Sequence, residues 1–356
     1  MHFTRRPWFL LAILLLLALA AFCVWLTWRD NRRSAALAEI KAAGGSVEWE
    51  ARLPRPFAKL LGRAWGKCSN ALQRVRWAEI CLAEVQGHES GEEKSLQQAT
   101  AQVEAWSRQL AGTPLRLTMM STELRYFGEA PLPDVQVLHI WPGVLSADDA
   151  PRLGAFPNLE VLFLRGGYIT SQTLAAIPCR ANLRELGLVG VGLDDEFLSQ
   201  LARLPKLSQL YLSGIYMTRM GPTHCVLQEP LELLDVHFTD LDCEDLRCLW
   251  RFARPRQFSM RSVSMAAEDC AAFATFDRVE DLGLYRCTFA EAGLAHLSAL
   301  ARLRKLHLNE TGITDAALPL LAAIPNLELV AMRGTAVTAA GVARLQTQRP
   351  GLKVEW

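Results

Sequence analysis

Residues 303–321 of this 356-residue chain read LRKLHLNETGITDAALPLL. The first half alternates apolar and polar residues, as a short half-buried strand does, and the second half spaces its apolar residues along one helix face. This pattern recurs every 24 residues without an insertion, so that nine units share one register. A fixed period of about 20 to 50 residues is typical of a solenoid, in which each unit buries its apolar face against its neighbours.

Three apolar columns carry the repeat. The first contains Val135, Leu159, Leu183, Leu207, Leu231, Pro255, Val279, Leu303 and Leu327. The second contains Leu138, Leu162, Leu186, Leu210, Leu234, Phe258, Leu282, Leu306 and Val330, and the third Ile140, Leu164, Leu188, Leu212, Val236, Met260, Leu284, Leu308 and Met332. We therefore predict one strand and one short helix per unit. Helix starts are indicated by residues whose side-chain oxygen accepts from first-turn N–H groups, at Thr170, Asp194, Thr218, Asp242, Thr314 and Thr338.

These residues resemble a leucine-rich repeat protein over about Pro133 to Trp356. Segments such as LRKLHL and TGITD, with Leu352-Lys-Val near the end, are similar to membrane-anchored leucine-rich repeat proteins of planctomycete bacteria. The resemblance implies an α/β solenoid, a parallel strand ladder with outer helices. There is one departure, because the slot that the family often fills with Asn holds Gly167, Val191, Ile215, Thr239, Val263, Cys287, Thr311 and Thr335.

A second strong feature is the segment Pro7 to Trp28, 22 residues without a charge, with arginines on both sides. This length is enough for one transmembrane helix through a bilayer core of about 30 Å. A cleaved signal peptide is the competing interpretation, because Ala18-Leu-Ala20 offers a small-residue cleavage site. Trp25 and Trp28, followed by Arg29, suit an interfacial belt and favour the anchor.

We expect four parts: a tail over residues 1–6, the transmembrane helix over 7–28, a basic juxtamembrane stem and capping region over 29–132, and the repeat domain over 133–356. Residues 1–80 hold 13 Lys/Arg and 5 Asp/Glu, a balance of +8, which leaves −7 for the remainder of a chain with net charge +1. The positive-inside rule only slightly favours a cytoplasmic location of the repeat domain, and long domains translocate largely regardless of charge. The side of the membrane stays open.

Within the stem, apolar residues at helical spacing accompany a row of cations formed by Lys59, Arg63 and Lys67. This segment is either a basic helix on anionic lipid or a cap over the open edge of the solenoid, and Gly62 and Gly66 favour the cap. Helices are also expected over Ser34–Ala43 and Glu92–Leu110, extended structure from Val75 to Leu82, and a strand from Leu115 to Met119.

Chemistry-bearing motifs are absent from the sequence: there is no His-Glu-x-x-His, no Gly-x-Ser-x-Gly and no Gly-Lys-Ser/Thr loop. The glycines of Gly187-Leu-Val-Gly190-Val-Gly192 lie in a repeat strand and turn, which favours a structural role. A metal site among His224, Cys225, His237, Cys243, Cys248 and Cys270 is disfavoured because no Cys-x-x-Cys pair is present. Cys225, Cys270 and Cys287 are better interpreted as core residues. We expect no enzyme activity, no cofactor and no metal.

Function must then depend on the residues between the leucines, which point out of the concave strand face. One outward column runs from His139 through Gly187 and Asp235 to Ala331, and the other from Trp141 through Val189 to Arg333. Tyrosine and arginine are enriched at binding hot spots. The predicted partner-binding set is Phe163, Arg165, Tyr211, His237, Arg261, Tyr285, Arg286, His307 and Arg333.

The sequence therefore predicts a membrane-anchored scaffold that binds a protein or peptide ligand. One alternative is a signalling or quality-control adaptor whose stem, from Arg52 to Leu110, recruits a second partner. A small catalytic stem is an alternative of another class, disfavoured because the stem lacks a catalytic cluster beyond Cys68, Cys81, Glu84 and His88. Nucleic acid is not expected as a partner, and the identity of the partner and the oligomeric state are not given by the sequence.

Overall fold

The computed structural model describes residues 32–43, 45–51, 73–81, 93–119, 121–127, 131–141, 145–165, 169–190, 192–193, 195–214, 216–217, 226–237, 243–266 and 269–356. These residues fall into two compact units. The first contains the described residues up to Thr118 together with Asp134–Gln136, and the second contains Met119–Pro133 and Val137–Trp356. The segment Pro7–Trp28 and the cations Lys59, Arg63 and Lys67 lie outside the described residues. Within the described ranges, no helix has the length and apolarity to cross a membrane.

The described residues of the first unit form two helices and three strands. A helix over residues 32–42 precedes β1 (Ser46–Ala51), β2 (Gln73–Cys81), α5 (Glu93–Gln109) and β3 (Leu115–Met119). β1 pairs with β2 antiparallel and β2 with β3 parallel. The indole of Trp106 on α5 is buried and donates to Glu39 Oε2 at 2.8 Å, which ties α5 to the first helix. The two helices and the two extended segments expected here are confirmed.

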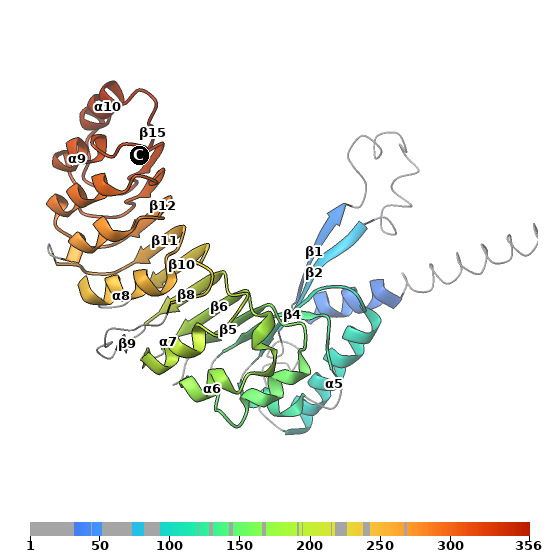
Figure 1. The fold of residues 1–356 in the computed structure, drawn as a ribbon. Helices are drawn as coiled ribbons and strands as arrows, with labels where there is room; N and C mark the ends of the chain where they lie inside the picture. Colours follow the sequence, from blue (N-terminus) through green and yellow to red (C-terminus); the bar gives the residue numbers. More distant parts are fainter. Residues whose placement is uncertain are drawn as a thin grey trace, which may run out of the picture. The chain divides into compact units, whose positions relative to one another are not determined.

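The second unit is a parallel ladder in which each strand pairs with the strand 24 residues later (Figure 1). Its strands follow in the order β4 (Val135–Ile140, of which Val137–Ile140 belong to this unit), β5 (Val161–Arg165), β6 (Glu185–Val189), β8 (Gln209–Ser213), β10 (Leu233–His237), β11 (Gln257–Arg261), β12 (Asp281–Tyr285), β13 (Lys305–His307), β14 (Leu329–Ala331) and β15 (Lys353–Glu355). Two short strands, β7 (Gly192–Leu193) and β9 (Tyr216–Met217), pair separately. The expected α/β architecture with a solenoid-like repeat is thus confirmed at this level.

Helical segments connect successive strands and lie on one face of the ladder (Figure 1). The α-helices are α6 (Ser171–Ala175), α7 (Asp195–Leu201), α8 (Cys243–Ala253), α9 (Leu318–Ala322) and α10 (Ala339–Gln348). The 3-10 helices are η2 (Ser121–Tyr126), η3 (Ala150–Ala155), η4 (Pro178–Asn182), η5 (Asp269–Thr275), η6 (Glu291–Ala299) and η7 (Asp315–Ala317). The expected α-helix is therefore replaced by a 3-10 helix in some units.

Three of the predicted helix starts are confirmed by side-chain caps. The hydroxyl of Thr170 accepts from the Thr173 N–H, that of Thr314 from Ala316, and that of Thr338 from Gly341. Each cap satisfies an N–H group that the first turn leaves without an intrahelical partner. Asp194, Thr218 and Asp242 lie outside the described residues.

The three predicted apolar columns form the strand side of the core. Every member of these columns is buried, including Pro255 and Phe258, which replace leucine in one unit. Burying one such side chain contributes about 1.5–3 kcal/mol. Because every unit supplies its members in the same register, the strand positions between the columns face outward in rows.

A left-handed turn follows the strands at a repeated position that the sequence pattern does not reveal. Gly190, Gly214 and Gly334 have positive φ, as expected for glycine. The equivalent position of three other units holds Ser262, Arg286 and Glu310, with φ of 54°, 54° and 57°. The repeat thus holds non-glycine residues in a conformation that L-residues adopt at a cost of about 1–2 kcal/mol.

Candidate functional site

The outward strand face is organised by the 24-residue register. Tyr211, Asp235 and Ser259 are direct cross-strand neighbours, as are Ser213, His237 and Arg261 in the next column. These two columns agree with the sequence prediction. A third column, which begins each strand and includes Glu185, Gln209, Asp281 and Lys305, was missed, although the pattern L-x-x-L places its second x in the strand.

An aromatic cluster covers the strands β4 to β8. The ring of Phe163 lies over Gly187, where an added Cβ would collide with three ring atoms. His139 meets this ring edge-on with centroids 5.0 Å apart, and the Tyr211 ring lies 5.5 Å away. Glycine at 187 thus allows an aromatic side chain to lie flat on the sheet.

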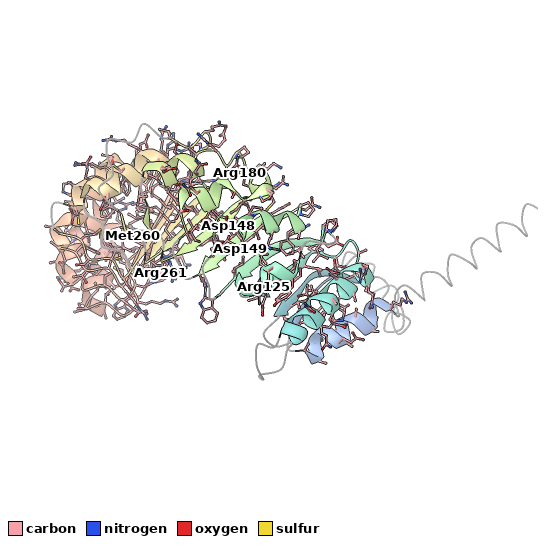
Figure 2. All side chains as sticks on the ribbon, turned by 90° about the horizontal axis from the view of Figure 1, so that it is seen from below. Arg125, Asp148, Asp149, Arg180, Met260 and Arg261 are labelled. Carbon is pink, nitrogen blue, oxygen red and sulfur yellow. The ribbon has the colours of Figure 1, made fainter. Side chains whose placement is uncertain are left out.

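A second aromatic cluster repeats this arrangement further along the ladder. The ring of Tyr285 lies over Gly283 and stacks on His307 at 5.6 Å. The Arg261 guanidinium lies 4.6 Å from the centre of the Tyr285 ring, in a cation–π contact. On β11 the neighbouring Met260 is buried in the core while Arg261 is exposed (Figure 2).

Between the two clusters lies the acid Asp235. It is only 7% exposed, and its Oδ2 is 2.9 Å from Nε2 of His237. Burial is the main cause that raises the pKa of Tyr211, and the charges of Glu185 and Asp235 raise it further. Burial also raises the pKa of Tyr285. Both phenols therefore keep their protons at neutral pH and can act as hydrogen-bond donors.

A cavity of about 500 Å³ opens over this part of the ladder. It is lined by Trp141, Phe163, Arg165, Gly187, Leu188, Val189, Tyr211, Leu212, Ser213, Asp235 and His237. Trp141 belongs to a predicted outward column but was left out of the predicted partner-binding set. It lines this cavity and its side chain is 58% exposed. A concave, partly aromatic site with a few polar groups is the usual form of a ligand pocket.

The structure thus brings Phe163, Arg165, Tyr211 and His237 together around one cavity, and places Arg261, Tyr285 and His307 in the second cluster. His307 Nε2 is also 3.2 Å from Asp281 Oδ1.

Arg286 and Arg333, the remaining members of the predicted set, are exposed and form ion pairs just beyond the ends of strands. Arg286 occupies the left-handed turn after β12, outside the strand columns, and its Nε donates to Glu310 at 2.7 Å. Arg333 pairs with Glu355 at 3.5 Å. Strand β12 ends at Tyr285, so Arg286 lies one residue beyond it, and its contribution to partner binding stays a prediction.

Four cysteines of the described ranges are packing residues. Cys179, Cys248, Cys270 and Cys287 are buried thiols. Burial raises the pKa of the Cys179 and Cys287 thiols to about 11, so that both are protonated at neutral pH. The described residues contain no group of three or more potential metal ligands, and Cys225 and His224 lie outside them.

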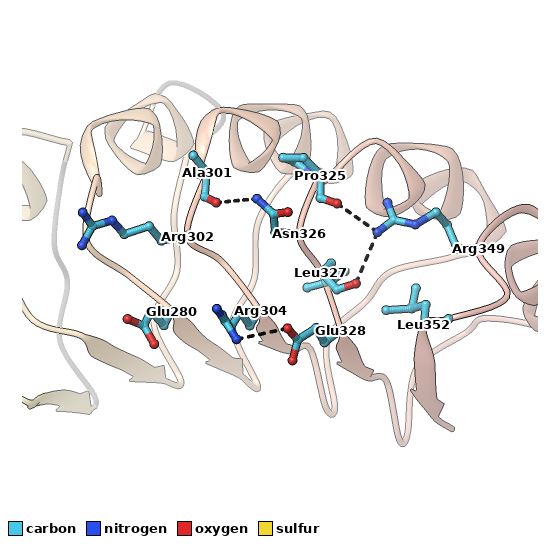
Figure 3. A pocket seen from close by; sticks show the side chains of 11 residues that line it. Glu280, Ala301, Arg302, Arg304, Pro325, Asn326, Leu327, Glu328, Arg349 and Leu352 are labelled. Carbon is cyan, nitrogen blue, oxygen red and sulfur yellow. Dashed lines mark hydrogen bonds and ion pairs between the residues drawn. The ribbon is translucent and has the colours of Figure 1, made fainter.

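A second cavity, of about 640 Å³, lies where the last units enter their strands (Figure 3). Two of its arginines are bound by other groups of the protein. Arg304 pairs with Glu328 at 3.3 Å, and the Arg349 guanidinium donates to the carbonyl oxygens of Ala322, Ile324, Pro325 and Leu327. This arrangement joins neighbouring units rather than offering free groups to a ligand.

Comparison with known proteins adds little. No protein-family model matches the chain, and no curated protein matches it. Among solved structures, the crystal structure of a protein from Bacteroides fragilis is similar over 75% of this chain and 84% of that one, with 14% identity and a TM-score of 0.42. A likeness of this degree carries no argument about function.

Proposed function

We propose that this chain is a membrane-anchored leucine-rich repeat protein, and that its outward strand face binds a protein or peptide. The observation that carries the proposal is the cavity over β5 to β10, in which aromatic rings, an arginine and a buried acid converge from consecutive units. Aromatic and arginine side chains provide contact area and directional polar groups, and for this reason they dominate binding hot spots.

The cavity suits an extended segment of a partner. It is open along the ladder, and each unit adds one row of side chains, so that the binding residues come from rigid strands held by a continuous core. Rigid strands lose little freedom when a ligand binds, and such pre-organisation favours affinity.

Affinity capture with the full chain tests this role. The variant carries Arg165→Ala, Tyr211→Ala, Arg261→Ala and Tyr285→Ala, all on the strand face. The matched control carries Gln172→Ala, Arg203→Ala, Glu229→Ala and Arg251→Ala at exposed positions outside the strand columns. We expect the wild type and the control to retain the same partners and the strand-face variant to lose them. Equal capture by all three proteins contradicts the proposal.

The anchor is proposed for Pro7–Trp28 because this segment has the length and apolarity of a membrane span. A protein held in this way stays with the membrane fraction after alkaline extraction, and deletion of residues 7–28 releases it. Protease treatment of intact cells, compared with lysed cells, then shows on which side the repeat domain lies. Release of the intact chain by alkali contradicts the anchor.

A further inference from the structure

The buried carboxylate of Asp235 lacks a full set of partners. Its Oδ2 faces His237, but its Oδ1 is buried and makes no hydrogen bond with any residue that the structure describes. A buried acceptor without a partner costs about 1–3 kcal/mol, and more when it is charged. Because Asp235 lines the cavity, a ligand donor that enters the cavity can supply the missing bond.

A second polar group lies beside it. Ser259 is the cross-strand neighbour of Asp235 on β11, and its buried Oγ has no hydrogen-bond partner among the described residues. Two unpartnered polar atoms on neighbouring strands, one of them a carboxylate oxygen, are unusual in a protein interior, where polar groups are nearly always paired.

The walls of the cavity select the charge of the ligand. Trp141, Phe163 and Tyr211 line the cavity, and aromatic rings attract cations to their π faces. Arg165 is exposed, whereas Asp235 is buried. A buried charge is screened less than an exposed one, so the carboxylate dominates and disfavours an anionic ligand.

From these observations we propose that the cavity over Asp235 binds the cationic side chain of an arginine or lysine residue in an extended peptide. The ammonium or guanidinium group donates to Asp235 Oδ1, and its methylene groups lie against the aromatic rings. This inference rests on the proposed peptide-binding role and specifies its ligand chemistry.

Binding of short peptides to the full chain in a mild non-ionic detergent tests the inference. The probes are acetyl-Ala-Arg-Ala-amide, acetyl-Ala-Lys-Ala-amide and the neutral isostere acetyl-Ala-citrulline-Ala-amide, titrated to about 10 mM and followed by saturation-transfer NMR. We expect one or both cationic peptides to bind at least about tenfold more tightly than the citrulline peptide, the difference typical of a charge-assisted hydrogen bond. The stronger cationic probe identifies the preferred side chain.

Two variants locate the site. Asp235→Asn preserves size and removes the charge, and it should weaken cationic-peptide binding about tenfold or more, whereas Asp148→Asn, at an exposed position outside the cavity, should leave it unchanged. Ser213→Lys, on β8 opposite His237, places an ammonium in the cavity and should block the probes while the Asp235 carboxylate is kept. The second variant keeps the test decisive if Asp235→Asn fails to fold.

The inference is overturned if neither cationic peptide binds by 10 mM, if citrulline binds equally well, or if both variants bind like the wild type. Loss of partners by the strand-face variant, with no cationic binding at Asp235, refutes the ligand chemistry alone. Cationic binding at Asp235 with unchanged capture of partners refutes the macromolecular role and leaves the cation site in place.

Discussion

Replacing Gly187 by alanine should displace the Phe163 ring, because an added Cβ cannot coexist with the ring in its present position. A phenylalanine side chain buries about 150–250 Å² when fully covered, and this half-buried ring loses about 100 Å² of that cover when it is pushed off the sheet. At about 25 cal/mol per Å², the lost burial is worth about 2.5 kcal/mol. The contacts with His139 and Tyr211 add about 0.5–1.5 kcal/mol each if they are fully lost.

The substitution also brings a gain, since alanine in a strand is favoured over glycine by roughly 0.5–1 kcal/mol. If the ring keeps its contacts with His139 and Tyr211, the net expectation is a loss of about 2 kcal/mol in the free energy of unfolding, and the loss is larger if those contacts break; the fall in Tm is about 4 °C or more. Urea denaturation of the full chain, followed by circular dichroism, measures it.

A double-mutant cycle separates ring displacement from other causes. In a Phe163→Ala background there is no ring to displace, so Gly187→Ala should become neutral or stabilising. Gly312→Ala is the matched control, because no atom lies within 4 Å of its added Cβ. The reasoning fails if Gly187→Ala is as benign as Gly312→Ala, or if its cost persists without the Phe163 ring.

Two further predictions concern the contacts between neighbouring units. Arg349→Ala removes the donor to four carbonyl oxygens, so we expect the free energy of unfolding to fall by about 1–3 kcal/mol and hydrogen exchange in α9 to become faster. Arg302→Ala, in the same cavity, is the control and should change stability by less than about 0.5 kcal/mol. Equal effects of the two substitutions would refute this role of Arg349. Hydrogen bonds from the Thr338 N–H and hydroxyl lower the pKa of Asp315 below its ordinary value of 3.8, so its contribution is present at neutral pH and fades as the pH falls from 3.8 through the lowered pKa. Asp315→Asn should therefore melt below the wild type at pH 7, with the gap closing in acid, and a pH-independent gap would exclude the carboxylate as its cause.

Much of the fold was predictable because burial repeats with the sequence. The columns of Leu306 and Leu308 continue unbroken from unit to unit, and such a period permits one register only. The outward columns follow from that register by alternation. The sequence therefore predicts that Tyr211 and Arg165 share a face, and both line one cavity in the structure.

The aromatic clusters and the left-handed turn could not be predicted, because they depend on contacts that the repeat period does not determine. Gly187 and Gly283 interrupt an outward column, and nothing in the sequence shows that the rings of Phe163 and Tyr285 lie over them. The left-handed turn at Arg286 was hidden because the residue is not glycine.

Asp235 was left out of the predicted site for a related reason. An isolated acid in an outward column is normally solvated, and only the structure shows that this one is buried at the floor of a cavity.

The spacing of the two glycines gives the strand face a length scale. Gly187 on β6 and Gly283 on β12 are separated by four strand steps, or about 19 Å at a spacing of about 4.8 Å. An extended peptide advances about 3.4 Å per residue, so side chains about six positions apart would meet the two aromatic clusters. The uninterrupted repeat therefore acts as a ruler: an insertion between these units would change which ligand lengths fit, even if every binding residue were kept.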